Sequence, residues 1–341
     1  MSDQLAGWSN PDGGLEAAAV VDHSLPTGSG YAVTLAGRRG LLPLRPMATG
    51  EVLDGAVAVT RAFPRPVLAF AAGIAIVSAL LDLTITLTLL GPVSVSSSEV
   101  SGNSDAATQL LGQTALSTGL NLLVALVTQA VMAGVMTAVV GRALFGTPTS
   151  LRQTWDELRP RLWRLIALSL LVGLTVYGTF FGGVLLFALL AATGAGGAVV
   201  GVLVLVSAGA TSVWLYTRWA LAPASMVLEK QGIRQAMKRS SALVRRSFWR
   251  VLGILLLALA ISLFVAFVVQ VPFQLLGYSP LSGFRSTYHL TTKQAVLGAV
   301  SGAVASTLVA PFVAGVRALL YIDRRMRAEG LDVALVAAVS P

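Results

Sequence analysis

The chain has 341 residues, of which 55% are hydrophobic and only 11% are charged, with a formal net charge of +9. Soluble domains typically have about 25% charged residues. Much of this protein's surface must therefore face something other than water. The sequence contains no cysteine, which excludes disulfides, thiol catalysis and cysteine-ligated metal sites.

Residues 1–40 are rich in Gly, Ser, Asp and Pro and show no periodicity, which is typical of a disordered tail. They contain no apolar stretch next to a basic start, so we expect no signal peptide. We predict that the membrane domain covers residues 41–334 and that residues 335–341 form a short C-terminal tail.

Six segments are long and apolar enough to cross a bilayer, which requires about 20 mostly apolar residues. They are 66–91, 115–141, 165–192, 195–217, 251–276 and 294–316. No charged residue occurs between Leu165 and Thr217, and "ATGAGGA" at 192–198 supplies the turn between two spans. A very hydrophobic soluble core is the alternative, but helices of a soluble core keep a polar face. The predicted fold class is an all-α, polytopic membrane helical bundle with six transmembrane helices in three hairpins.

The basic residues fall almost entirely on one side of these spans. Five precede the first span, five lie between spans two and three, eight lie between spans four and five, and four follow span six. Only Arg285 and Lys293 fall on the other side. Because basic connections stay in the cytoplasm, we expect a multi-pass cell-membrane protein with both termini cytoplasmic. The high isoelectric point then reflects bilayer topology, and nucleic acid is not an expected partner.

A short amphipathic stretch precedes each odd-numbered span, with apolar residues at i, i+4, i+7 and i+11 apart from one polar substitution, Ser240, in the third stretch. The three sets are Val52, Ala56, Val59 and Phe63; Leu151, Trp155, Leu158 and Leu162; and Ile233, Met237, Ser240 and Val244. Such spacing predicts helices that lie in the cytoplasmic interface. The even-numbered spans end alike, at "GRALF", "TRWAL" and "VRALL". We therefore predict three copies of an interfacial helix followed by a transmembrane hairpin.

Three G-x-x-x-G pairs occur within the spans, and small residues let helix backbones approach closely in lipid. The pairs are Gly178 and Gly182, Gly197 and Gly201, and Gly298 and Gly302. We expect these glycines to mark contacts between helices.

Three stretches resemble a known family: "LPLRPMATGEVLDGAVAVTR", "LAPASMVLEKQGIRQAMKRSSALVRRSFWRVLGI" and "LLYIDRRMRAEGLD". They are similar to actinobacterial stand-alone members of the glycerophosphoryl diester phosphodiesterase membrane-domain family. The resemblance implies a multi-pass bundle in the cell membrane, without the catalytic domain. In the phosphodiesterase, a separate soluble barrel carries paired histidines and metal-binding carboxylates. Here only His23 and His289 are available, so the hydrolase chemistry transfers to no position of this sequence.

Arg142, Arg218 and Arg317 occupy equivalent places in the three repeats, at the cytoplasmic boundary. One interpretation is that they are snorkelling anchors, with charged ends in the interface. The alternative is a basic vestibule that contacts anionic phospholipid headgroups, because the planar guanidinium of arginine binds phosphate through two hydrogen bonds.

Two polar residues within the spans are candidates for an intramembrane site, because ionisable groups in lipid are costly and often functional. Asp82 lies near the external end of span one and is either an interfacial acid or a proton- or cation-responsive group. Gln129 lies in the middle of span two, where an interhelical hydrogen bond is the simpler interpretation.

The charged stretch "YIDRRMRAEG" follows the last span, where Asp323, Glu329 and Asp332 can pair with neighbouring arginines. Those arginines are Arg324, Arg325 and Arg327. We interpret this stretch as an anchor with an intramolecular charge network; a motif that docks a partner is the alternative.

No Walker loop, H-E-x-x-H or G-x-S-x-G motif occurs, so we predict no enzyme, no catalytic residue, no cofactor and no metal. A non-catalytic membrane scaffold or complex subunit is the favoured function. A carrier or a lipid- or phosphodiester-handling protein is the alternative, and an intramembrane hydrolase is a second one. The expected partners are the bilayer, anionic phospholipid headgroups, and membrane or cytoplasmic proteins.

The predicted orientation can be tested with a reporter fused to either end of the chain. Because both termini are expected on the basic side, each reporter should be inaccessible to protease added outside intact cells. Reporters found on opposite faces of the membrane would contradict the six-span topology.

Overall fold

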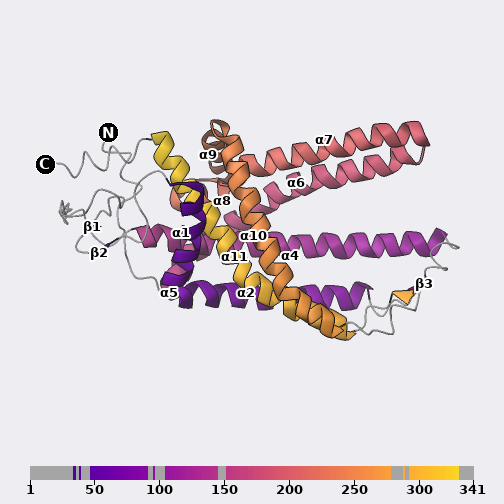
Figure 1. Ribbon diagram of the computed structural model, residues 1–341, viewed down its shortest axis with the longest axis horizontal. Coiled ribbons are helices and arrows are strands. Elements are labelled where there is room, and N and C mark those ends of the chain that lie inside the picture. The colour runs from indigo at the N-terminus through magenta and orange to yellow at the C-terminus, as the bar shows by residue number, and fades with distance from the viewer. Residues whose placement is uncertain are drawn as a thin grey trace.

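The computed structural model describes residues 34–35, 38–39, 47–90, 95–96, 104–144, 151–277, 287–288 and 292–329. Within them, six helices are long and apolar enough to cross a membrane, which confirms the predicted number of spans. They are α2 (Pro64–Ile85), α4 (Ser104–Leu144), α6 (Leu162–Ala191), α7 (Ala195–Trp219), α10 (Phe248–Gly277) and α11 (Thr292–Glu329) (Figure 1). The predicted tails at 1–40 and 335–341 lie outside the described residues, except for two strands of two residues.

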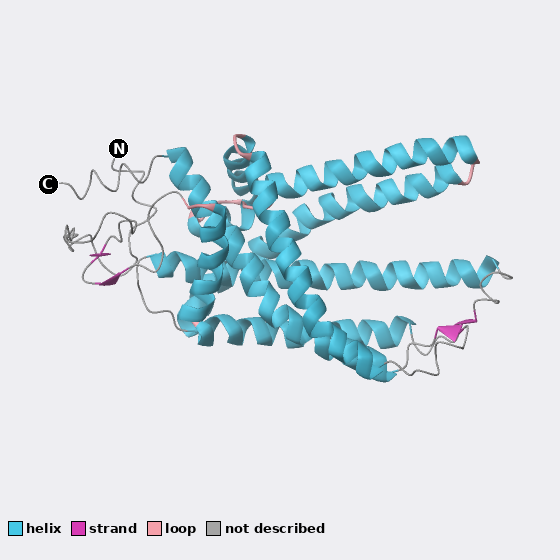
Figure 2. Ribbon diagram, in the orientation of Figure 1, coloured by secondary structure: helices cyan, strands magenta, loops and turns pink. Residues whose placement is uncertain are grey.

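Shorter elements connect the long helices (Figure 2). The helices are α1 (Thr49–Ala62), α5 (Leu151–Leu158), α8 (Ala222–Leu228) and α9 (Ile233–Arg245), with a π-helix, η3 (Thr86–Leu90), and a 3₁₀ helix, η4 (Arg159–Arg161). Two antiparallel strand pairs join β1 (Thr34–Leu35) to β2 (Arg38–Arg39) and β3 (Val95–Ser96) to β4 (Thr287–Tyr288). The β3–β4 pair brings the connection after α2 beside the connection after α10, at the end of the bundle away from α9.

The predicted amphipathic helices α1, α5 and α9 precede α2, α6 and α10, and with α8 they define what we call the basic end of the bundle. The apolar stripe of α1 is confirmed, since Val52, Ala56 and Val59 are all buried. In α5 the stripe is less regular. Leu158 is buried, but Trp155 is 42% exposed and stacks on Phe70 of α2 at a centroid distance of 6.2 Å.

The three hairpins pack in a cyclic order that agrees with the predicted repeat. Within each hairpin the two helices contact each other: α2 with α4, α6 with α7, and α10 with α11. Each amphipathic helix then packs on the second helix of the preceding hairpin. Helix α5 lies on α4, α9 lies on α7, and α1 completes the ring by packing on α11.

The first helix of each hairpin also contacts the second helix of the preceding hairpin, which produces three seams between hairpins. We call them the α11–α2 seam, the α4–α6 seam and the α7–α10 seam. Helices α7 and α10 contact each other much less extensively than the pairs at the other two seams. Figure 1 shows α7 and α10 diverging from the basic end outward, so the third seam is the open one.

The core lies near the basic end, where α1, α2, α4, α8 and α11 meet. It is built from alanine, valine, leucine and methionine side chains, together with Tyr321. The outer parts of α6 and α7 extend beyond this core as a separate hairpin, with exposed apolar side chains such as Leu185 and Leu203. In a bilayer these side chains face lipid, because acyl chains are as apolar as leucine.

The G-x-x-x-G expectation is wrong for two of its three pairs. A Cβ atom added to Gly178, Gly182, Gly298 or Gly302 would meet nothing within 4 Å, so these glycines face open space or lipid. Only the pair of Gly197 and Gly201 marks a helix contact, where a Cβ on Gly201 would lie 2.9 Å from the Phe187 ring.

The close approaches occur at other glycines. A Cβ on Gly134 would lie 2.6 Å from Leu158, and one on Gly315 would lie 3.2 Å from the Cβ of Ala56. Gly183 lies directly against Ala208, inside van der Waals distance for any added Cβ. The spacing rule failed because a glycine pair shows that a contact is possible but does not show which helix face meets a partner.

Replacing Gly183 by Val should separate α6 from α7, because the Cβ of Ala208 cannot move without its backbone. We expect a loss of about 1–3 kcal/mol, the usual cost of overpacking, measured as a lower unfolding temperature in detergent. Gly178→Val is the matched control on the same helix, where an added side chain meets nothing. Equal effects of the two substitutions would contradict the packing of this hairpin.

Candidate functional site

The C-terminal charged motif lies within α11, and its acid Asp323 is fully buried. Asp323 accepts hydrogen bonds from the backbone N–H of Met47 at 2.9 Å and from Nε of Arg327 at 2.9 Å. Arg324 donates to the other carboxylate oxygen from Nε at 3.0 Å. The carboxylate therefore holds the residue that precedes α1 against the last helix. The predicted pairing of Asp323 with Arg324 and Arg327 is confirmed, whereas Asp332 and the side chain of Glu329 lie outside the described residues.

The backbone carbonyl of Met47 accepts hydrogen bonds from two arginines, Arg250 and the same Arg327. Arg250, at the start of α10, donates from Nη2 at 2.7 Å, and Arg327 donates from Nη2 at 3.0 Å. A single backbone position before α1 thus joins two helices of the third hairpin. Its partners are more than two hundred residues away in sequence.

A second carboxylate, Glu229 at the end of α8, forms a parallel network. Tyr321 donates its hydroxyl to Glu229, and Arg239 of α9 donates from Nε at 3.1 Å. Arg325 lies 3.7 Å from the same carboxylate oxygen, and Gln231 donates to the other oxygen at 2.6 Å. Arg325 therefore pairs with an acid that lies far from its own motif in the sequence. Glu229 links α8 and α9 to α11.

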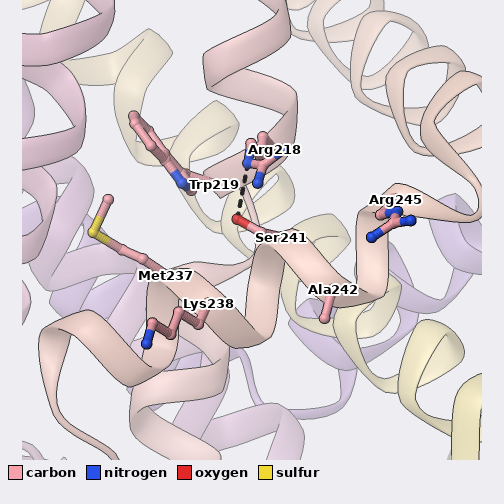
Figure 3. A pocket seen from close by; sticks show the side chains of 7 residues that line it. All are labelled: Arg218, Trp219, Met237, Lys238, Ser241, Ala242 and Arg245. Atoms are coloured by element: carbon pink, nitrogen blue, oxygen red, sulfur yellow. Dashed lines mark hydrogen bonds between the residues drawn. The ribbon is translucent and has the colours of Figure 1, made fainter.

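A basic hollow lies where α7 meets α9, and its volume is about 350 Å³. We define the basic hollow by the side chains that line it: Arg218, Trp219, Met237, Lys238, Ser241, Ala242 and Arg245. Figure 3 shows Arg218 above Ser241, with Lys238 and Arg245 on either side along α9. All the ionisable lining residues are basic, so the hollow attracts anions.

Arg218 is only partly satisfied by its surroundings. Its Nε donates to the hydroxyl of Ser241 at 3.1 Å, and its guanidinium lies 5.0 Å from the ring centroid of Trp214. Ser240, the residue before Ser241, donates to the backbone carbonyl of Arg218 at 2.8 Å. These contacts fix the end of α7 on α9. They leave the terminal Nη1 and Nη2 of Arg218 without a hydrogen bond to any residue that the structure describes.

A second hollow adjoins the first and leads toward the α7–α10 seam. It shares Arg218, Ser241 and Arg245 with the basic hollow and adds Trp214, Val244 and Phe248. We call it the aromatic hollow. Arg218 and Arg245 line both hollows, whereas Lys238 lines only the basic hollow and Trp214 and Phe248 line only the aromatic one. Basic and aromatic side chains thus lie together, as they do at a membrane interface.

The structure does not bring the three candidate arginines into one vestibule. Arg218 alone among them lines the two hollows. Arg317 instead donates to the Tyr216 hydroxyl at 2.5 Å and lies over its ring. Arg142 has polar partners of its own near the end of α4. Repeat-equivalent positions thus have different environments.

The two intramembrane candidates, Asp82 and Gln129, are both partly exposed, on α2 and α4 respectively. One carboxylate oxygen of Asp82 is buried and has no hydrogen-bond partner among the described residues. No hydrogen bond joins Asp82 to Gln129 among the described residues. Among the described residues, no group of three or more His, Asp or Glu side chains could hold a metal ion.

Sequence reasoning missed Lys238, Ser241 and Arg245, although their spacing was visible. They stand at i, i+3 and i+7 on α9, which places them on one face of a helix. The apolar stripe of the same helix drew attention to the adjacent face, about 100° away around the helix. The two partners of Glu229 that come from α11, Tyr321 and Arg325, are about ninety residues away, so the sequence near Glu229 does not reveal them.

The six apolar helices and their polar end define a multi-pass helical membrane protein. Residues 197–301 match the family model described as the membrane domain of glycerophosphoryl diester phosphodiesterase. The match includes α7, α8, α9 and α10, and therefore both hollows and Glu229, and it confirms the predicted resemblance over that segment. No curated protein and no solved structure matches the chain.

Replacing Asp323 by Asn should destabilise the protein strongly, because Arg324 and Arg327 would lose their shared anion. Breaking a buried ion pair on one side costs about 3–5 kcal/mol, which unfolding in detergent can measure. The control is Asp156→Asn, the same change in a pair with Arg152 whose side chains are 65% and 93% exposed. That control should cost less than about 1 kcal/mol. Similar losses in the two variants would show that the Asp323 network is not a structural one.

Proposed function

We propose that this protein is a non-catalytic membrane scaffold or a subunit of a membrane complex. The observation that carries the proposal is that two buried carboxylates, Asp323 and Glu229, are both engaged in structural hydrogen bonds. Asp323 and Glu229 accept hydrogen bonds from arginines, a tyrosine and a backbone amide, so their charges join helices. A general acid or base must reach the reacting atom, and these carboxylates are occupied by structural partners.

The packing near the basic end also supports a structural role. The buried cluster among α1, α2, α4 and α11 consists mainly of Ala, Val, Leu and Met side chains. A permeation path requires polar groups or water along its length. The two hollows described above lie at the basic end, beside α7 and α9, and at the edge of the buried core, to which Val244 also belongs. In the orientation expected from the basic residues, this end faces the cytoplasm.

A lipid- or phosphodiester-handling protein is the second candidate, and the basic hollow favours it. Arginine binds phosphate oxygens in a planar, two-bonded geometry, and Arg218 has its terminal nitrogens available within the described structure. The matching family model is named for the membrane domain of a phosphodiesterase, which supports a phosphodiester as the chemical class.

The scaffold proposal is tested by crosslinking in native membranes, followed by purification in mild detergent. We expect the chain to recover at least one membrane protein at a constant molar ratio, and the ratio should not change in Asp82→Asn. Recovery of the chain alone under all crosslinking conditions would contradict the proposal.

Measurements on liposomes that contain the purified chain test the two alternative functions, a carrier and an intramembrane hydrolase. We expect no ion or phospholipid flux above that of empty liposomes, and no hydrolysis of added glycerophosphodiesters. Flux that disappears in Asp82→Asn would favour a carrier, and turnover of a glycerophosphodiester would favour a hydrolase. Either result would overturn the scaffold proposal.

A further inference from the structure

The three seams of the ring differ in how the protein fills them. At the α4–α6 seam, Gly134 of α4 lies against Leu158 and Leu165, and Gly173 of α6 lies against Leu126. At the α11–α2 seam, the preceding helix α1 fills the space, since Gly315 of α11 contacts Ala56. Both seams are closed by direct contact between protein side chains.

The α7–α10 seam is less filled by protein, because α7 and α10 contact each other much less extensively than the helices at the other two seams. A Cβ atom on Gly209 of α7 or on Gly253 of α10 would meet nothing within 4 Å. The two helices diverge away from the basic end (Figure 1). In a membrane, acyl chains occupy any space between helices that side chains leave open, because such space is accessible from the hydrocarbon.

Both hollows lie at the basic end of this open seam. Arg218 and Trp214 come from α7, Arg245 ends α9, and Phe248 begins α10. The hollows are therefore built by the two elements that border the seam and by the helix that connects them. The equivalent arginine of the third hairpin, Arg317, donates one hydrogen bond to Tyr216 of α7 and lines neither hollow.

The level of the hollows in the bilayer follows from the aromatic side chains beside them. Trp214 is 46% exposed and Trp249 is 81% exposed, next to Phe248. Tryptophan side chains that face lipid concentrate at the headgroup level of the membrane. The cations of the basic hollow therefore lie where phospholipid phosphates lie, and the aromatic hollow lies toward the acyl chains.

We propose that the α7–α10 seam and its two hollows bind one anionic phospholipid. Its phosphate lies in the basic hollow, where Nη1 and Nη2 of Arg218 and the side chains of Lys238 and Arg245 neutralise it. The hydroxyl of Ser241 accepts from Arg218 and still has its own hydrogen to donate to a phosphate oxygen. The part of an acyl chain nearest the headgroup lies against Trp214 and Phe248, and the rest of that chain continues between α7 and α10.

A lipid fits this site better than a free anion because the aromatic hollow continues directly from the basic one. A soluble phosphate would leave Trp214, Val244 and Phe248 unused. The inference requires only that the chain lies in a bilayer. It holds whether the protein is a scaffold that retains the lipid or a carrier that moves it, because retention is measured without flux.

Native mass spectrometry of the full chain in mild detergent, with phosphatidylglycerol or phosphatidylcholine added, tests the proposal. We expect one retained phosphatidylglycerol and at least tenfold weaker retention of phosphatidylcholine, whose choline places a cation beside the three side chains. Arg245→Gln should weaken phosphatidylglycerol binding about fivefold, the contribution of one basic residue near a membrane surface. Arg218→Gln combined with Arg245→Gln should weaken it further.

Arg246→Gln is the matched control, because Arg246 is the next residue in the chain, is also exposed and lines neither hollow. It should leave lipid retention unchanged. The exposed position of Arg245 means that Arg245→Gln should fold normally, which keeps the test valid if the double variant does not fold. The proposal would be overturned if wild type and Arg245→Gln retained phosphatidylglycerol equally. It would also be overturned if Arg245→Gln and Arg246→Gln lost phosphatidylglycerol to the same extent.

Competition with inorganic phosphate separates a lipid site from a simple anion site. We expect millimolar inorganic phosphate to leave bound phosphatidylglycerol in place, because the anion lacks contacts with the aromatic hollow. Full displacement by phosphate, with no dependence on the acyl chains, would overturn the assignment to a lipid. Loss of lipid binding with unchanged protein partners would leave the scaffold proposal intact, so the two proposals fail separately.

Discussion

Two buried carboxylates, Asp323 and Glu229, determine how the helices of this protein meet at the basic end. A buried charge is stable only when it is paired and hydrogen-bonded, so each acid requires the elements that supply its partners to stay together. Asp323 requires Met47 and thereby the start of α1. Glu229 requires α9 through Arg239 and α11 through Tyr321. The cyclic order of the hairpins depends on this requirement. Helices α1 and α11 lie at opposite ends of the sequence, and the bond between Met47 and Asp323 holds them together.

Lipid makes these polar contacts more important than they would be in water. Helices in a bilayer gain little from hiding apolar surface from one another, so packing must come from close approach or from polar links. The described structure uses both. Gly183 and Gly315 let backbones approach Ala208 and Ala56, and the two carboxylates join the helix ends. Where neither device operates, as between the outer parts of α7 and α10, the helices separate.

The sequence predicted the spans well because their signal is local and large. A helix in hydrocarbon must satisfy its backbone internally and cannot carry many charges, so charge-free segments such as Leu165 to Thr217 are unambiguous. The amphipathic stripe of α1 was equally readable, since burial of Val52, Ala56 and Val59 follows from helical spacing alone. The partners of individual side chains were harder to predict from the sequence. Arg325 pairs with Glu229 almost a hundred residues away, and no pattern within "YIDRRMRAEG" distinguishes that arginine from Arg324.

The repeat predicted equivalence where the structure shows divergence. Arg218 and Arg317 occupy matching places at the ends of α7 and α11, but their neighbours decide their roles. Each guanidinium makes one hydrogen bond and one ring contact, Arg317 with Tyr216 and Arg218 with Ser241 and Trp214. Only Arg218, however, lines the two hollows. Three similar hairpins produce three similar seams, and the seam that protein side chains fill least is the one that can hold a ligand. Binding sites in repeated membrane folds lie at the interfaces between repeats. The α7–α10 seam meets that condition because it is the interface at which the repeats pack least, so a lipid there would supply the contacts that Ala56 and Leu158 supply at the other two.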